Sequence, residues 1–193
     1  MNHLIDRFPE AVRIDGEVYP LNTDFRVGLR IMAAFEDARL MDFEKQAVMC
    51  GLLFQKQPPD FDRACAAAVK FLDCGEEPEK VDADLPQPTR VYSFTKDAKY
   101  IYSAILQTHG VDLQTVEHLH WWKFCAMFGD LREDCAFQSI VSLRRRASKG
   151  KLTKEEKQVW YEMQDVLYLQ ERVPDPERDA ALAEFDRLMQ GGD

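Results

Sequence analysis

The chain has 193 residues, of which 46% are apolar and 31% charged, and its formal net charge is −9. A chain of this length can bury a core of its own, so it needs neither disulfides nor a metal to fold. The acidic balance disfavours nucleic acid as the main partner, because phosphate backbones are repelled, and no apolar run is long enough to predict a membrane-spanning helix.

The cysteines argue for a reducing environment. There are five of them, with no C-x-x-C spacing that would indicate a zinc knuckle or a redox motif. An odd number of cysteines, with no signal peptide at the start of the sequence, favours the cytoplasm. The five are Cys50, Cys65, Cys74, Cys125 and Cys135. Most of them lie beside apolar residues at helical spacing and are interpreted as core residues.

The first predicted element is a β-hairpin. The short runs Ala11–Ile14 and Glu17–Tyr19 flank Asp15-Gly16, a dipeptide typical of a tight type I′ turn. Pro20 is expected to stop the ladder, because proline has no N–H to donate. Two strands alone are only marginally stable, so the hairpin must pack on helices or pair with another chain.

Three helices are predicted next, each from apolar residues three and four positions apart behind a capping residue. The expected caps are Thr23 or Asp24 for the first helix, Asp42 for the second and Asp60 for the third, which Gly75 ends. Together with the hairpin these helices form a predicted N-terminal part, residues 1–75.

Residues 76–90 differ in composition from the rest. They contain five carboxylates and three prolines and offer little apolar surface to bury, which is typical of an exposed linker or mobile loop. This segment is predicted to divide the chain, with a C-terminal helical part following in residues 91–173.

The C-terminal part is again helical by its spacing and caps. A terminal helix, possibly mobile, is expected in residues 174–193, where Asp175 caps and Pro176 fits the first turn. The fold class is therefore mainly α, a bundle of about six to eight helices with a small N-terminal β-hairpin. Before the terminal helix, a helix is expected to begin at Ser93 or Thr95 and to end at His109-Gly110, and a short helical piece is expected to begin at Asp112. The aromatic segment 119–128 and a helix that begins at Asp134 follow. A long helix is then expected behind the capping box Thr153–Glu156.

The aromatic segment is the most unusual feature of the sequence. Trp121, Trp122, Phe124 and Phe128 point in several directions around one helix. A helix that is apolar on most sides is either central to the core or shares one face with a partner. Core burial is the favoured interpretation, and a contribution to a protein interface is the alternative, since aromatic residues are enriched at interface hot spots.

A basic run follows, with seven cations in residues 144–157. A solvated helix end is the simplest interpretation, because cations suit a helix C-terminus. Binding an acidic protein surface is the second. Nucleic acid is the least favoured, because the run lacks interleaved aromatic residues for stacking.

The sequence contains no pattern typical of a catalytic or metal site. His118 and His120 are two positions apart, so on a helix they diverge and cannot grip one metal. Cys125 and Cys135 lie in no nucleophile signature, and no glycine-rich phosphate-binding loop occurs. We therefore predict no catalytic residue, no metal and no cofactor, and we expect the protein not to be an enzyme.

Several spaced blocks of the sequence resemble a family of small proteins from long-tailed bacteriophages and prophages. The blocks cover most of residues 1–170, and the segment after Pro174 has no counterpart. They are Phe8-Pro9, Thr23–Arg26, Tyr100–Ile105, Gly110–Leu113, His120–Phe124, Met127–Leu131, Phe137–Ile140 and Arg144-Arg145-Arg146.

The resemblance implies a tail-assembly chaperone. Such proteins are encoded between the major tail protein and the tape-measure protein, and they coat the long helical tape measure before the tail tube polymerises. This implies action in the host bacterial cytoplasm and absence from the mature virion. It also implies possible self-association, or association with a longer form made by ribosomal frameshifting. A structural tail-completion or connector component, or a helical adaptor or regulator, is the alternative.

A chaperone of this kind needs an apolar groove for an amphipathic client helix and a charged rim. The groove is expected to draw on the aromatic segment and on the terminal helix, and the charges on the basic run. The predicted interaction residues are Trp121, Trp122, Phe128, Phe137, Arg144, Arg145, Arg146, Phe185 and Met189.

Overall fold

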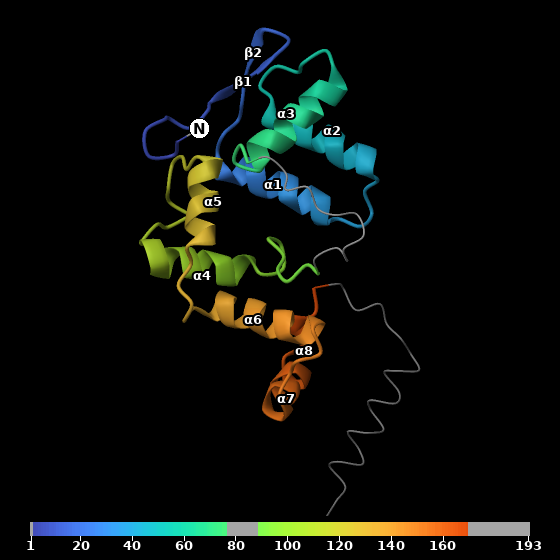
Figure 1. Cartoon of the computed structure of the whole chain (residues 1–193), viewed down its shortest axis with the longest axis vertical. Coiled ribbons are helices and arrows are strands. Elements are labelled where there is room, and N and C mark those ends of the chain that lie inside the picture. Colours follow the sequence, from blue (N-terminus) through green and yellow to red (C-terminus); the bar gives the residue numbers. More distant parts are fainter. Residues whose placement is uncertain (1, 77–88, 170–193) are drawn as a thin grey trace, which may run out of the picture.

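The computed structural model describes residues 2–76 and 89–169 (Figure 1). The described part contains eight helices and one two-stranded antiparallel sheet, which confirms the predicted mainly α fold with an N-terminal hairpin. The elements are β1 (Ala11–Ile14), β2 (Glu17–Pro20), α1 (Phe25–Glu36), α2 (Asp42–Leu53), α3 (Phe61–Leu72), α4 (Ala98–His109), α5 (Trp121–Gly129), α6 (Ala136–Ser148), α7 (Lys154–Glu162) and α8 (Gln164–Leu167).

The hairpin turns as its sequence predicts. Asp15 and Gly16 both have positive φ, 50° and 84°, as a type I′ turn requires. Pro20 is the last residue of the ladder and pairs with Ala11. Tyr19 is buried and meets the ring of Phe54 edge-on, so the hairpin packs on the helices.

Four predicted helix boundaries are confirmed, and each is fixed by local capping. Asp24 accepts a hydrogen bond from the Arg26 N–H and Asp60 from the Arg63 N–H, and Gly110 ends α4 with a φ of 67°. The Thr153–Glu156 capping box is present in both directions. These caps satisfy N–H groups that would otherwise have no partner at the start of a helix.

Five boundaries differ from the prediction. Asp42 is the first residue of α2 rather than its cap, and Glu44 accepts from the Met41 N–H. Ser93 caps a separate turn through the Lys96 N–H, so α4 begins only after Asp97. The other three differences are that Asp112 opens a turn rather than a helix, that α6 begins after Cys135, and that the long C-terminal helix is split at Met163 into α7 and α8.

One main core joins the residues on both sides of residues 77–88. Its buried members run from Ile14 to Val141. Helix α5 lies between α1 and α4 (Figure 1), and Phe124 of α5 is fully buried and stacks on Phe25 of α1. A second, small cluster of Ile140, Leu143 and Leu167 holds α8 against α6.

Backbone hydrogen bonds tie the start of α1 to the start of α5. The Phe25 N–H donates to the Leu119 carbonyl and the Trp121 N–H to the Thr23 carbonyl. Gly28 allows this close approach, because a Cβ there would lie 2.2 Å from a ring carbon of Trp121. In the described residues, none of the helices combines the length and apolar character that crossing a bilayer demands.

Candidate functional site

The two tryptophans of the aromatic segment lie in the core. Trp121 is 3% exposed and Trp122 is 5% exposed. Their indole N–H groups donate to the carbonyls of Leu72 and Phe71, at 2.9 and 2.7 Å. The favoured interpretation, core burial, is confirmed. The alternative, a contribution of Trp121 and Trp122 to a protein interface, is corrected, because buried side chains present no surface to a partner.

The predicted aromatic groove residues Phe128 and Phe137 face each other. Phe137 is buried, whereas Phe128 is half-buried, and their ring centroids are 5.5 Å apart in a cluster that also includes Tyr92. The interaction prediction is therefore corrected for Phe137, which packs inside. For Phe128 it stays a prediction. Phe185 and Met189 lie outside the described residues.

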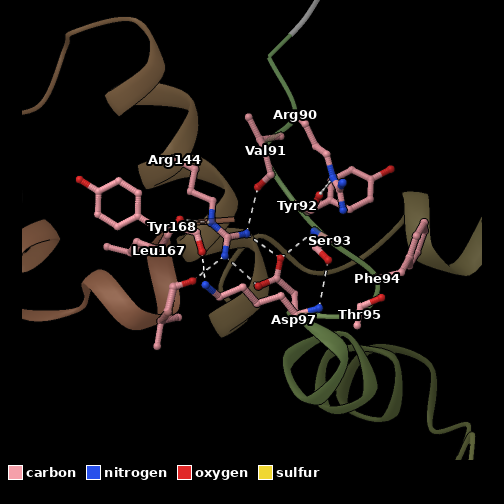
Figure 2. A network of polar contacts seen from close by, with 12 residues as sticks. Arg90, Val91, Tyr92, Ser93, Phe94, Thr95, Asp97, Arg144, Leu167 and Tyr168 are labelled. Atoms are coloured by element: carbon pink, nitrogen blue, oxygen red, sulfur yellow. Dashed lines mark hydrogen bonds and ion pairs between the residues drawn. The ribbon is translucent and has the colours of Figure 1, made fainter. Parts of the chain in front are cut away.

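Arg144 is buried in an ion pair rather than solvated. It is 4% exposed and binds Asp97 through both carboxylate oxygens, at 2.6 and 2.8 Å (Figure 2). The same guanidinium donates to the carbonyls of Val91, Val166 and Leu167, so all five of its N–H groups are used. The predicted interaction role of Arg144 is corrected, because this side chain joins three segments of its own chain.

The next two arginines remain at the surface. Arg145 is exposed, and Arg146 is half-buried between Ser142 and Glu156, with a guanidinium-to-carboxylate distance of 2.8 Å. Their interaction role stays a prediction. The basic run therefore combines one buried cation, one half-buried cation paired with Glu156 and five exposed cations.

A second polar network holds the segment before α4. Glu36, at the end of α1, accepts hydrogen bonds from the Ser93 hydroxyl and from the Phe94 and Thr95 N–H groups, and it pairs with Arg90. Burial raises the pKa of Glu36, but these hydrogen bonds and the nearby cation outweigh it, so the pKa is lowered. This carboxylate stays charged and positions Phe94.

His120 caps the start of α5. Its Nδ1 accepts from the Trp122 N–H at 3.1 Å, while its Nε2 lies 3.1 Å from the Pro9 carbonyl. This arrangement needs a neutral ring with the proton on Nε2. Burial lowers the pKa of His120, although the Pro9 hydrogen bond opposes the shift and His118 adds to it.

The stability of the fold is therefore expected to depend on His120 in mild acid. A lowered folded-state pKa means that the unfolded chain binds the proton more tightly, so stability is lost as the pH falls below the ordinary value of 6.5. Urea titrations at pH values from about 7.5 to about 5.5 should show this loss in the wild type. It should be smaller in His120→Asn, which keeps a capping oxygen but does not titrate. Parallel pH profiles would contradict the assignment.

A shallow apolar groove lies between α1 and α4. It has a volume of about 300 Å³. Its lining is mostly apolar and also includes Arg26, Arg30 and Gln114. The guanidinium of Arg26 pairs with Asp24 and donates hydrogen bonds to the carbonyls of Leu113 and Val116. The apolar lining consists of Phe25, Leu29, Phe94, Ala98, Ile101, Tyr102, Leu113 and Phe124.

Arg30 differs from Arg26 because its guanidinium is available to bind a partner's carboxylate. It is exposed, and it forms no ion pair with any residue in the described part of the chain. A free guanidinium beside an apolar groove can bind a carboxylate with two hydrogen bonds. No local sequence pattern indicates this groove, because its lining comes from α1, α4, α5 and the connections between them.

The thiols of the described residues differ in pKa, and the hydrogen bond with Cys125 lowers the pKa of Cys74 although burial opposes this. Burial raises the pKa of Cys50 to about 12, and the contact with Cys74 together with burial raises that of Cys125, so neither thiol is activated as a nucleophile. Among residues 2–76 and 89–169, no group of three or more His, Cys, Asp or Glu side chains could hold a metal ion.

These features define a mainly helical protein with a small N-terminal hairpin and, in its described residues, an apolar groove between α1 and α4. The profile described as "Bacteriophage Gp15 protein" matches residues 4–169. The chain belongs to this bacteriophage protein family. No curated protein and no solved structure matches the chain.

Proposed function

We propose that this chain is a non-enzymatic tail-assembly chaperone that binds the tape-measure protein and keeps it soluble until the tail tube polymerises. The observation that carries the proposal is the apolar groove between α1 and α4 with the free Arg30 in its lining. Membership of a bacteriophage protein family supports it. A long helix that is apolar on one face aggregates when naked, so it needs such a surface during assembly.

The groove suits one part of an amphipathic helix. Its volume of about 300 Å³ is at the small end of ligand pockets, enough for apolar side chains from adjacent turns of a helix. Arg30 favours a client segment with a carboxylate beside its apolar face. Because one small groove binds weakly, several copies would have to act along a long client.

The proposal extends to location and partners. The chain acts in the host bacterial cytoplasm and leaves before the virion is complete, associating with copies of itself or with a frameshifted longer form. Mass spectrometry of purified particles tests whether the chain is absent from the finished virion. A stoichiometric amount of this chain in virions would instead support the alternative of a structural component.

Filling the groove is expected to abolish client binding. Ala98 is exposed and lines the groove, so Ala98→Trp should block it without removing any core side chain. Co-expression with the tape-measure protein should then leave most of the client in the insoluble fraction, whereas wild type keeps it soluble. The readout is the soluble share of the client.

The matched control is Ala126→Trp, which places the same ring at an exposed position on α5 that does not line the groove. This variant should solubilise the client as wild type does. If Ala98→Trp also remains fully active, the groove is not the client site. If wild type itself fails to solubilise the client, the proposed function is wrong.

A further inference from the structure

The described part of the chain ends close to the groove. The ammonium group of Lys96 donates a hydrogen bond to the Tyr168 carbonyl, and Arg144 binds the carbonyls of the two residues before Tyr168. Lys96 lies between Phe94 and Ala98, which both line the groove. Figure 2 shows Tyr168 beside this segment at the start of α4. The residues that follow therefore begin within reach of the groove.

The sequence after residue 169 carries an apolar stripe bordered by carboxylates. Residues 170–193 lie outside the described part of the chain and contain seven carboxylate side chains and three arginines. Spacing of three and four positions predicts one apolar face on the terminal helix that the sequence indicates. Glu177 and Glu184 fall along one edge of this face and Asp186 along the other. The apolar positions are Ala181, Leu182, Phe185, Leu188 and Met189.

The groove complements this stripe in charge. Its lining contains two arginines and no Asp or Glu of the described residues. Arg30 is the lining cation that has no ion pair there. The exposed Lys99 and Glu117 lie outside the lining and carry opposite charges. The carboxylates on the surrounding segments have partners within the chain: Asp24 pairs with Arg26, Asp112 accepts from Tyr102 and Gln114, and Glu36 pairs with Arg90.

We propose that residues 174–193 bind in the groove of their own chain and compete there with the client. Phe185 and Leu188 lie against its apolar lining in this arrangement, and Glu184 pairs with Arg30. The terminal segment thus acts as an internal substitute for an amphipathic client helix.

The length of the connection allows this contact. Residues 170–175 can span about 20 Å when extended, whereas α4, with its 12 residues, is about 18 Å long. An occupant attached by a short connection has an effective concentration in the millimolar range, so a weak interaction is enough to cover the groove. A covered groove does not expose its apolar lining to unrelated proteins.

This inference deepens the proposed function, and the competition with the client rests on the groove being the client site. A client must displace the terminal segment, so a single short apolar helix binds poorly. A long client that contacts several copies at once overcomes the competition. The segment therefore makes the groove selective for long helical clients.

Photocrosslinking of the full chain tests the contact without any client. Benzoylphenylalanine in place of Phe185 should, on irradiation, crosslink to α1 or α4 residues that line the groove. The product should be intramolecular at every protein concentration, as mass spectrometry of the digested chain shows. The control places the same photoreactive residue at Gln190, on the opposite face of the predicted helix, and should give little groove product.

A charge exchange tests the predicted ion pair. Arg30→Glu should lower the yield of the groove crosslink by about three-fold, because exposed ion pairs contribute modestly. Adding Glu184→Arg to Arg30→Glu should restore the yield. The control is Arg145→Glu, an exposed arginine outside the groove, which should crosslink as the parent does.

Binding of an added peptide measures how far the groove is covered. The probe is a fluorescent peptide of residues 174–193, followed by anisotropy. Phe185→Asp with Leu188→Asp in the full chain should bind it about ten-fold more tightly than wild type does, because the internal competitor is removed. Ala180→Asp with Ala183→Asp adds the same charge away from the apolar face and should bind as wild type. Circular dichroism checks that each variant is folded.

Crosslinks from position 185 to α7 or to a second chain, in place of the groove, would overturn the inference, and so would equal peptide binding by wild type and Phe185→Asp with Leu188→Asp. On co-expression with the tape-measure protein, that variant should keep at least as much client soluble as wild type. Less soluble client would mean that the segment binds the client instead, which also overturns the inference. If wild type solubilises no client while the crosslinks hold, the proposed function fails and the intramolecular contact stands.

Discussion

Replacing Arg144 by methionine is expected to lower the free energy of unfolding by about 3–5 kcal/mol. Removing one partner of a buried ion pair leaves the other charge without compensation, and here Asp97 is fully buried. The substitution would also leave the carbonyls of Val166 and Leu167 without their donor. Urea denaturation followed by circular dichroism measures the loss.

Arg145→Met is the matched control, because the neighbouring arginine is exposed. It should change stability by no more than about 0.5 kcal/mol. The double variant Asp97→Leu with Arg144→Met should cost less than the sum of the two single changes, since apolar residues can replace a buried pair with little loss. Equal effects of Arg144→Met and Arg145→Met would refute the structural role of the pair.

The second large effect is expected at Trp122. Changing it to alanine should lower the free energy of unfolding by about 3–5 kcal/mol, as is typical when a buried tryptophan is truncated. The ring packs against Phe8, Phe71 and His3, and its loss would also remove the hydrogen bond to the Phe71 carbonyl. Thermal and urea unfolding measure the change.

Trp160→Ala serves as the comparison for Trp122→Ala. Trp160 is half-buried and belongs only to the small second cluster, so its truncation should cost clearly less. A loss at Trp122 no larger than that at Trp160 would contradict the core assignment. Because Trp122 supports the fold, a soluble-client assay on Trp122→Ala would report unfolding, and Ala98→Trp is the better probe of client binding.

Local sequence rules predicted the features that depend on a few neighbouring residues. The Asp15-Gly16 turn, the Asp24 and Asp60 caps and the Thr153–Glu156 box each follow from side chains within four positions of the backbone groups that they satisfy. The core position of Trp121 and Trp122 also followed from spacing, because a helix that is apolar all round needs cover on every side.

The missed features depend on residues far apart in the chain. His120 caps its own helix, but its other nitrogen is held by Pro9, more than a hundred positions away. Ser93 is a predicted cap of α4. In the structure its hydroxyl and the following N–H groups donate to Glu36, and α4 begins later, at Ala98. The three adjacent arginines 144–146 form one basic run in the sequence. In the structure Arg144 is buried, because it pairs with the buried Asp97.

The sequence by itself determined that this chain is a mainly helical protein with an N-terminal hairpin, and where α1, α3 and α7 begin and α4 ends, because turns and caps are satisfied locally. Only the tertiary structure decided which polar and aromatic side chains remain accessible. Burial depends on which distant segments pack together, and that packing placed Arg144 inside against Asp97, while it left Phe43 and Phe61 outside and formed a groove from four separate segments.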